Sequence, residues 1–566
     1  MGMGNRISGR WLCRILIITS KGETCMIRIN QLKLDIHHSE ADLKAKILKT
    51  LRIKEDALLS YSIQKQSIDA RKKPDLFYVY AIDVIVKNES ALKKHIKNKN
   101  ILFREKPIPY TVHVTGTEKL SCRPVIIGTG PAGLFCGYQL ALLGYRPILL
   151  ERGASVDERI ADVDRFWEKG ILNLNSNVQF GEGGAGTFSD GKLNTLVHDS
   201  QGRNTRVLEI FVEQGAPKEI LYQNKPHIGT DILARVVKNI RAFILSHGGE
   251  VHFHTQVVDI QTETYNGQKK LTALKVKNLL DGTFSILNTN LAVLAIGHSA
   301  RDTFSMLYKN GIPMDAKSFA VGIRMEHPQE MINQNQYGER YSKDLPAAAY
   351  KLTANLPNGR GVYTFCMCPG GYVVNASSES GRLAVNVMSY HARDGRNANS
   401  AVIVTVTPED YGAENALSGV EFQRRLEEKA YQAGSGKIPV QLFADFCQNL
   451  PSKEPGNITP QMKGDYTWTN VRAIFPEELA ASLEDGIKTF ETKLSGYSRP
   501  DAVISGVESR TSSPVRIHRD DTMQSDLCGL YPCGEGAGYA GGITSAAMDG
   551  LKVAESIAQK YQIFDN

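Results

Sequence analysis

Alternating apolar and polar residues begin at Met26 and predict a β-strand. Residues 27–34 keep the two-residue period of a strand with one buried face. A helical period follows over 43–51, where leucine and isoleucine line one face. Two further runs, around 59–66 and 76–86, again have the composition of strands. The first hundred residues therefore predict a small mixed α+β unit.

Capping and turn residues set the borders of this unit. Ser39-Glu40-Ala41-Asp42 is an acidic variant of the capping box and marks a helix start. A short second helix is predicted near Glu89, and Lys106-Pro107-Ile108-Pro109 has the composition of a linker. We expect an α+β domain over 26–110. Residues 1–25, whose apolar patch is short and broken by arginine, are expected to be a non-structural extension.

From Pro124 onward the pattern changes to that of an α/β protein. Short buried-strand runs alternate with helices, which is typical of a parallel sheet covered by helices. We expect a Rossmann-like domain over 121–305 and 501–566, whose second piece begins with a strand over 501–506. Residues 306–500 are expected to form an inserted α+β substrate or cap domain.

The net charge of +7 is concentrated in the N-terminal part of the chain. Residues 26–120 carry 19 basic and 11 acidic side chains, whereas residues 121–566 carry 44 and 48. Such a basic unit can meet nucleic acid, an acidic partner or another domain. Surface charge more often serves solubility alone, which we favour here.

Composition argues against two classes of protein. No run of 18 apolar residues occurs, so neither a transmembrane helix nor a membrane partner is predicted. The nine cysteines are scattered, without a CxxC pair or a histidine cluster at metal spacing. No metal site is therefore expected, and a reducing, cytoplasmic compartment is the default.

A glycine-rich turn follows the first buried strand, residues 124–127. Its GxGxxG motif and the start of the next helix comprise Gly128, Gly130, Pro131, Ala132 and Gly133. The first glycine permits a tight turn, the second lets a pyrophosphate approach the backbone, and the third lets the helix pack closely on the sheet. The helix start offers free N–H groups and a positive dipole end to phosphates.

An acidic residue ends the second strand of this βαβ unit. Glu151 follows Gly128 by 23 residues, where a carboxylate accepts hydrogen bonds from ribose hydroxyls and repels a 2′-phosphate. Arg152 is included in the predicted cofactor site. The alternative is an ordinary βαβ turn, but the strand, glycines, helix and acid all agree with a dinucleotide site. These residues alone leave FAD and NAD open.

Further motifs resemble those of FAD-dependent oxidoreductases of the two-domain, glutathione-reductase-like type. A second FAD motif is read at 530–536, followed by a glycine-rich helix start at 541–550. With the G-E-G-G-A-G-T-F-S-D-G-K loop at 181–192 and E-S-R-T-S-S-P at 508–514, the chain is identified as a member of the bacterial family described as uncharacterised FAD-dependent dehydrogenases. The resemblance covers nearly everything from Met26 onward. It implies FAD as cofactor and brings no substrate.

The resemblance also implies cofactor roles outside the first motif. Glu535 would contact the ribityl chain, and the helix that starts after Gly542, at Ile543, would face the flavin pyrimidine ring. Val257, on a strand predicted over 251–260, would touch adenine through its backbone. Gly184, Gly297 and Gly534 complete the expected FAD-contacting set.

Candidates for catalysis are few. The guanidinium of Arg510 is a candidate partner of an anionic substrate or of reduced flavin, and a salt bridge with Glu508 is an equal alternative. Arg324 and Glu326 share a face of a predicted strand and are expected to form a surface ion pair. His327, on the other face, is the second catalytic candidate, as a proton donor near the flavin.

Cys366 and Cys368 are close enough in sequence to raise the question of thiol chemistry. Redox pairs favour a two-residue spacer, and these cysteines have a spacer of one. We expect buried packing rather than a redox-active pair.

The expected function is a cytoplasmic flavoenzyme that holds FAD non-covalently and acts on a small-molecule substrate. No second complete GxGxxG occurs, so NAD(P)H is considered only as a transient electron donor. One alternative is an NAD-dependent dehydrogenase that uses the same βαβ site. The other is an RNA-acting flavoprotein, disfavoured because the basic unit lacks an aromatic stacking platform. The substrate and the oligomeric state are not predicted.

Overall fold

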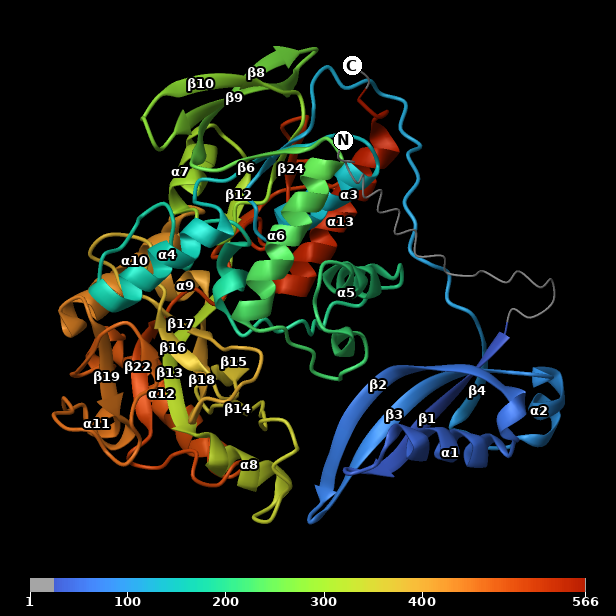
Figure 1. The fold of residues 1–566 in the computed structure, drawn as a ribbon. Coiled ribbons are helices and arrows are strands. Elements are labelled where there is room, and N and C mark those ends of the chain that lie inside the picture. The colour runs from blue at the N-terminus through green and yellow to red at the C-terminus, as the bar shows by residue number, and fades with distance from the viewer. Residues whose placement is uncertain (1–24, 565–566) are drawn as a thin grey trace, which may run out of the picture. The chain divides into compact units, whose positions relative to one another are not determined.

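A computed structural model describes residues 25–564 of the chain (Figure 1). The expected extension over 1–25 lies outside the described residues, except for Cys25, which begins the first strand. The chain divides into two compact units, and the division after Ile108 falls within the predicted linker. Among the described residues, one unit comprises 25–66 with 78–108. The other comprises 67–77 with 109–564.

The N-terminal sheet has the strand order β2-β3-β1-β4. Its elements are β1 (Cys25–Asp35), α1 (Glu40–Leu51), β2 (Leu58–Lys72), β3 (Asp75–Val86), α2 (Glu89–His95) and β4 (Ile101–Glu105). The capping box at Ser39 is present, and Leu43, Ile47 and Leu51 are buried as the helical period requires. β4 was not predicted. It is a short edge strand that pairs antiparallel with β1, and such pairing has no local signature.

A five-stranded parallel sheet is the centre of the larger unit. Its order is β24 (Leu530–Pro532), β11 (Ala292–Leu294), β5 (Val125–Ile127), β6 (Ile148–Leu150) and β7 (Glu250–His252). All neighbouring pairs are parallel. This arrangement is the mixed α/β fold that the alternating pattern predicted.

The two faces of the parallel sheet pack against different elements (Figure 1). Four helices cover one face, where they pack on Ile126, Leu149 and Val293. These helices are α3 (Pro131–Leu142), α5 (Arg203–Glu213), α6 (Thr230–Ser246) and α13 (Ile543–Lys560). Val125 and Leu294 point to the other face. A three-stranded sheet and the helix α7 (Arg301–Lys309) pack against this face. The strands of the sheet are β8 (Thr255–Tyr265), β9 (Gln268–Asn278) and β10 (Phe284–Asn288).

The strand predicted over 251–260 is two strands that belong to different sheets. β7 joins the parallel sheet and β8 the three-stranded sheet. His254, between them, has a φ of 53°, a left-handed conformation that interrupts an extended chain. The prediction of one continuous strand was therefore wrong.

A seven-stranded sheet forms the inserted part of the larger unit. Its order is β14 (Thr353–Asn355), β15 (Gly361–Cys368), β18 (Asn397–Val406), β13 (Phe319–Pro328), β22 (Val503–Glu508), β19 (Ile438–Leu442) and β21 (Tyr466–Trp468). The helices of this part are α8 (Gln329–Tyr337), α9 (Pro408–Tyr411), α10 (Ser418–Gly434), α11 (Phe443–Gln448) and α12 (Glu477–Phe490).

β22 corrects the expected border of the inserted domain. Residues 501–506 were assigned to the Rossmann-like domain, but β22 lies between β13 and β19. Its register with β13 is antiparallel, with Met325 opposite Ile504. The hydrogen bonds of β22 therefore extend the inserted sheet to Glu508. The sequence could not show this, because the strands that pair with β22 are distant from it in sequence.

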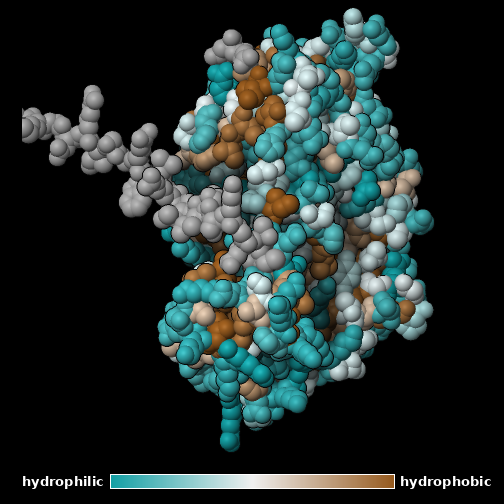
Figure 2. Space-filling view, turned by 90° about the vertical axis from the view of Figure 1, so that its right-hand side faces the viewer, coloured by the Kyte–Doolittle hydropathy of each residue, from teal (hydrophilic) through white to brown (hydrophobic). Residues whose placement is uncertain are grey.

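The larger unit also contains smaller elements. They are α4 (Val156–Lys169), the pair β12 (Met314–Ala316) and β23 (Val515–Ile517), and the sheet of β17 (Val385–Met388), β16 (Tyr372–Asn375) and β20 (Met462–Lys463). On the face drawn in Figure 2, hydrophilic residues predominate and hydrophobic ones form separate groups. Within residues 25–564, none of the helices combines the length and the apolarity that crossing a membrane requires.

Candidate functional site

A cavity of about 480 Å³ opens at the carboxyl ends of the parallel strands. The turn after β5, the loop at 181–192 and the start of α13 line one part of it. Residues of β15 and the segment at 349–351 line the other part. The cavity thus lies where the parallel sheet meets the inserted domain, the usual place for a ligand in an open α/β sheet.

The three glycines of the first motif have different surroundings. A Cβ at Gly128 would clash with the Ala295 carbonyl, and one at Gly133 would clash with the Gly128 carbonyl. A Cβ at Gly130 would meet only the Cα of Gly184, at 3.8 Å. The chain itself therefore requires the first and third glycines. The space beside the second is left free and faces the cavity.

Twelve of the fourteen predicted cofactor residues line this cavity. They are Gly128, Gly130, Pro131, Ala132, Glu151, Arg152, Gly184, Val257, Gly297, Glu535, Gly542 and Ile543. Gly133 and Gly534 do not line it. A Cβ at Gly534 would lie 2.6 Å from that of Ala132, so this glycine serves the packing of α3.

The carboxylate of Glu151 is occupied by bonds within the protein. One oxygen accepts from the Thr129 amide at 2.9 Å and from its hydroxyl at 2.7 Å. The other accepts from the amides of Gly153 at 2.9 Å and Gly181 at 3.1 Å. Glu151 therefore joins three backbone segments around the cavity. Its predicted bonds to ribose remain a prediction.

Arg159 on α4 holds the glycine-rich loop in place. The fully buried guanidinium donates to five carbonyls, those of Asn177, Val178, Gly181, Glu182 and Gly184, at 2.7 to 3.2 Å. Burial lowers the pKa of Arg159 to about 10, against the opposing charges of Glu151 and Glu182. Sequence reasoning missed this residue, because nothing near Arg159 in sequence identifies the loop as its partner.

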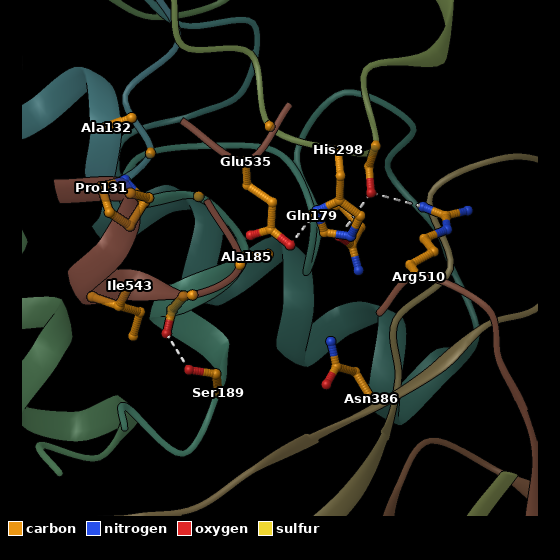
Figure 3. A pocket seen from close by; sticks show the side chains of 18 of the residues that line it. Pro131, Ala132, Gln179, Ala185, Ser189, His298, Asn386, Arg510, Glu535 and Ile543 are labelled. Carbon is orange, nitrogen blue, oxygen red and sulfur yellow. Dashed lines mark hydrogen bonds and ion pairs between the residues drawn. The ribbon is translucent and has the colours of Figure 1, made fainter. Parts of the chain in front are cut away.

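His298 and Glu535 both line the cavity, and their side chains point toward each other (Figure 3). Burial, then repulsion from Arg510 and Arg301, lowers the pKa of His298 to about 3. Burial raises the pKa of Glu535 to about 7. The Nε2 atom of His298 is buried without a hydrogen-bond partner among the described residues. His298 was not predicted, because no local motif marks it as a candidate in the sequence.

Arg510 lines the cavity but its partner differs from the predicted one. Its guanidinium binds both oxygens of Glu427, at 2.9 and 2.8 Å, and donates to Ser378 and Ser299. Arg301 binds the same carboxylate at 2.7 and 2.8 Å. Burial alone would raise the pKa of Glu427, but the two arginines hold it well below its usual range. The predicted salt bridge with Glu508 is therefore wrong.

Glu508 pairs instead with Arg324. The two side chains are buried and bonded at 2.8 and 3.1 Å. Glu326 accepts from the Asn397 side chain and from the Gln461 amide, each at 2.9 Å. The expected surface ion pair of Arg324 and Glu326 does not exist, because both residues lie inside the seven-stranded sheet.

His327 is not in the cavity. It is fully buried, and its Nε2 atom lies 2.7 Å from the Tyr497 carbonyl. Burial lowers the pKa of His327 to about 4, so the ring is neutral at physiological pH. The proposal of His327 as a proton donor near the cofactor was wrong. The side of the sheet to which a histidine points depends on its position along the strand, and His327 points to the side that packs against Tyr497.

Cys366 and Cys368 are separated by an irregularity in β15. Cys366 has a φ of 40°, and the register with β18 shifts between Phe365 and Cys368. Cys368 is fully buried with its sulfur 3.2 Å from Asp190, whereas Cys366 lines the cavity. Burial raises the pKa of both thiols. Both are free thiols, and the described residues contain no cluster of side chains suited to a metal ion.

One set of lining residues was not predicted from the sequence and is called here the far part of the cavity. It comprises Tyr350, Lys351, Asn386, Lys192 and Lys225. Lys192 belongs to the glycine-rich loop, and Lys225 precedes α6. These residues come from separate segments, which only the fold brings together.

Comparisons with known proteins find matches within each of the two units. Residues 318–511 match the model of an FAD-dependent protein, C-terminal domain-like, and residues 26–85 match a domain of unknown function, DUF8436. An uncharacterised protein of Clostridium beijerinckii (strain ATCC 51743 / NCIMB 8052) is 47% identical over 543 residues, which cover 95% of this chain and 99% of that protein.

A search of solved structures also returned similar chains. A flavoprotein/dehydrogenase from Cytophaga hutchinsonii has a TM-score of 0.35 and 11% identity, over 78% of this chain and 80% of that one. A glycerol-3-phosphate dehydrogenase from Bacillus halodurans, complexed with FAD, has a TM-score of 0.34 and 11% identity, over 79% and 65%.

Proposed function

This chain belongs to the same family as the Clostridium beijerinckii protein, and we propose that it is an oxidoreductase that binds FAD non-covalently, as the match of residues 318–511 to an FAD-dependent protein supports. The observation that carries the proposal is the space beside Gly130. This glycine caps the start of α3 with its φ at −70°, so no strained backbone requires it, and a side chain there would extend into the cavity. A helix start with free N–H groups beside such a space fits a pyrophosphate.

The remaining contacts are proposed from the resemblance to glutathione-reductase-like flavoproteins, which is itself part of the proposal. Glu151 and Val257 would hold the adenosine end. The start of α13, at Gly542 and Ile543, would hold the flavin end, with Glu535 at the ribityl chain. A Cβ at Gly542 would meet nothing within 4 Å, which leaves room for a ligand at this helix start.

FAD, when bound, transfers a hydride equivalent between a donor and an acceptor. The chain's own contribution is charge and proton control at the flavin end. Oε1 of Glu535 is the atom best suited to hold or release a proton near neutral pH, because burial raises the pKa of this carboxyl to about 7. Arg510, fixed by Glu427, supplies a constant positive charge at the cavity wall.

The experiment that tests this function is purification of the full chain followed by absorbance spectroscopy. The expected result is a yellow protein with about one FAD per chain, released on denaturation. Anaerobic addition of NADH, NADPH and a panel of small metabolites then identifies the electron donor by flavin bleaching.

A colourless protein that binds NAD would contradict the proposal and favour the NAD-dependent alternative. The RNA-acting alternative is tested separately, by RNA binding with a steep dependence on salt. The cytoplasmic location stays a prediction.

A further inference from the structure

We propose that the far part of the cavity binds an anionic small molecule, through a carboxylate or phosphate group held by Lys225 and Lys192. This inference rests on the proposed function and deepens it by naming the class of substrate. The site is separate from the start of α3, where the pyrophosphate of FAD is proposed to lie.

The first observation is the unbalanced charge of Lys225. This side chain lines the cavity at its solvent-exposed rim. Among the described residues, no carboxylate lies within ion-pair distance of it, and its charged neighbours are the cations Lys192 and Arg393. Desolvation and these two cations lower its pKa. A cation surrounded by cations is stabilised by an anion that enters from outside.

The second observation is that the nearby carboxylate is already used. Asp190 is bound by Arg393 at 2.9 and 2.5 Å, and it accepts from the Ser389 hydroxyl at 2.5 Å. Lys192 lies 3.4 Å from the same carboxylate. Burial would raise the pKa of Asp190, but Lys192 and Arg393 hold it well below its usual range. Asp190 is thus shared by two cations, Lys192 and Arg393. Lys225 is a third cation in this group, and within the described part of the chain it has no carboxylate of its own.

The other acids on the cavity wall do not compensate for this charge. Glu151 is bound by backbone amides and Glu508 by Arg324. Glu535, the fourth acid that lines the cavity, lies beside His298, and burial raises its pKa to about 7. Lys351, exposed on the same cavity, adds another cation without a carboxylate within ion-pair distance among the described residues. Cations without a carboxylate partner at a cavity wall attract ligands of the opposite sign.

The cavity also carries groups that can orient such a ligand. The amides of Asn194 and Asn386 and the hydroxyl of Thr364 line it. Lysine is a flexible point charge and does not distinguish a carboxylate from a phosphate by geometry. The shared chemistry is therefore an oxyanion, which belongs either to an acidic substrate or to the phosphate of a nicotinamide nucleotide donor.

The test is a titration of the FAD-loaded full chain with benzoate, succinate, inorganic phosphate and NADPH at low ionic strength, followed by flavin absorbance. At least one of these anions is expected to give a saturable spectral change. Lys225→Met should raise its Kd about tenfold or more, since a charge-assisted bond is lost. Lys225→Arg should largely keep the affinity, and Lys218→Met, which removes an exposed lysine outside the cavity, should leave it unchanged.

The different anions in the titration distinguish an acidic substrate from the phosphate of a nicotinamide nucleotide. A Lys225→Met effect on benzoate or succinate supports an acidic substrate, whereas an effect confined to NADPH supports the donor's phosphate. Equal Kd values in wild type and Lys225→Met, equal losses in Lys218→Met, or no saturable change with any probe would each overturn the inference. Failure of the proposed function is seen independently, as a protein that contains no FAD.

Discussion

The Nδ1 atom of His298 lies 3.9 Å from Oε1 of Glu535. Burial acts on the two groups in opposite directions, since it lowers the pKa of His298 to about 3 and raises that of Glu535 to about 7. At pH 6 the histidine is therefore neutral and the carboxyl mostly protonated. The pair gains one negative charge as the pH rises through 7, at the place where the flavin end of the cofactor is proposed to lie.

This pair predicts a pH dependence of the flavin midpoint potential. If the flavin lies there as proposed, its reduction would add negative charge beside Glu535 and raise the pKa of this carboxyl, so that reduction above pH 7 would take up one extra proton. The wild-type potential should therefore fall more steeply above pH 7 than below it, by about 30 mV per pH unit for a two-electron couple. Glu535→Gln should remove the break, as measured by anaerobic spectroelectrochemistry. Glu326→Gln, at a carboxyl with a similar pKa outside the cavity, should keep it. A break that survives in Glu535→Gln would assign it to another group.

Gly130→Val and Gly133→Val should fail in different ways. A side chain at Gly130 meets little of the protein, so the variant should fold but lose FAD. A side chain at Gly133 clashes with the Gly128 carbonyl, so this variant should lose soluble, folded protein. Circular dichroism and the flavin content of purified protein separate the two results. Stoichiometric FAD in Gly130→Val would show that the pyrophosphate lies elsewhere.

Glu151→Ala should lower stability and flavin content together. The substitution leaves the buried amides of Thr129, Gly153 and Gly181 without their acceptor, at a cost of about 2–4 kcal/mol in the free energy of unfolding. Urea unfolding of the flavin-free protein measures this loss. If Glu151 acts on ribose alone, the flavin-free variant will be as stable as the wild type and only FAD affinity will fall.

Glu326 should make the protein less stable as the pH rises from 4.5 to 7. Burial raises the pKa of Glu326 to about 7, against hydrogen bonds from Asn397 and Gln461, and its Oε1 atom lacks a partner among the described residues. The folded state therefore binds more protons than the unfolded state in this window, which is worth about 3 kcal/mol. Urea unfolding at pH 5 and pH 8 should show a smaller difference in Glu326→Gln than in wild type. The exposed Glu330→Gln serves as the control, and an unchanged difference in Glu326→Gln would contradict the prediction.

The sequence predicted what is encoded locally. The capping box at Ser39, the turn at 128–133 and the helix start at Ile543 each depend on a few adjacent residues, and the structure has these elements at those positions. Their cofactor roles rest on the resemblance. Such motifs can be recognised in a sequence because the conformation of a tight turn or a helix cap is determined by its own residues.

Partners distant in sequence could not be predicted in the same way. The sequence alone allows Arg510 to pair with either of two acids, Glu427 or Glu508. The arrangement of α10 against β22 decides that it pairs with Glu427. His298 faces Glu535 across more than two hundred residues of sequence. Strand β22 looks locally like part of a parallel sheet but pairs with β13. In each case the deciding contact is made by tertiary packing.

The bonds that Arg159 makes to five carbonyls have a consequence for the thermodynamics of ligand association. A glycine-rich loop free in solution would lose much conformational entropy on closing around a ligand, because glycine samples more backbone states than other residues. Here that loss is incurred when the polypeptide folds, since one buried guanidinium already fixes residues 177–184. The loop is preorganised, and more of the favourable contact energy remains available as affinity.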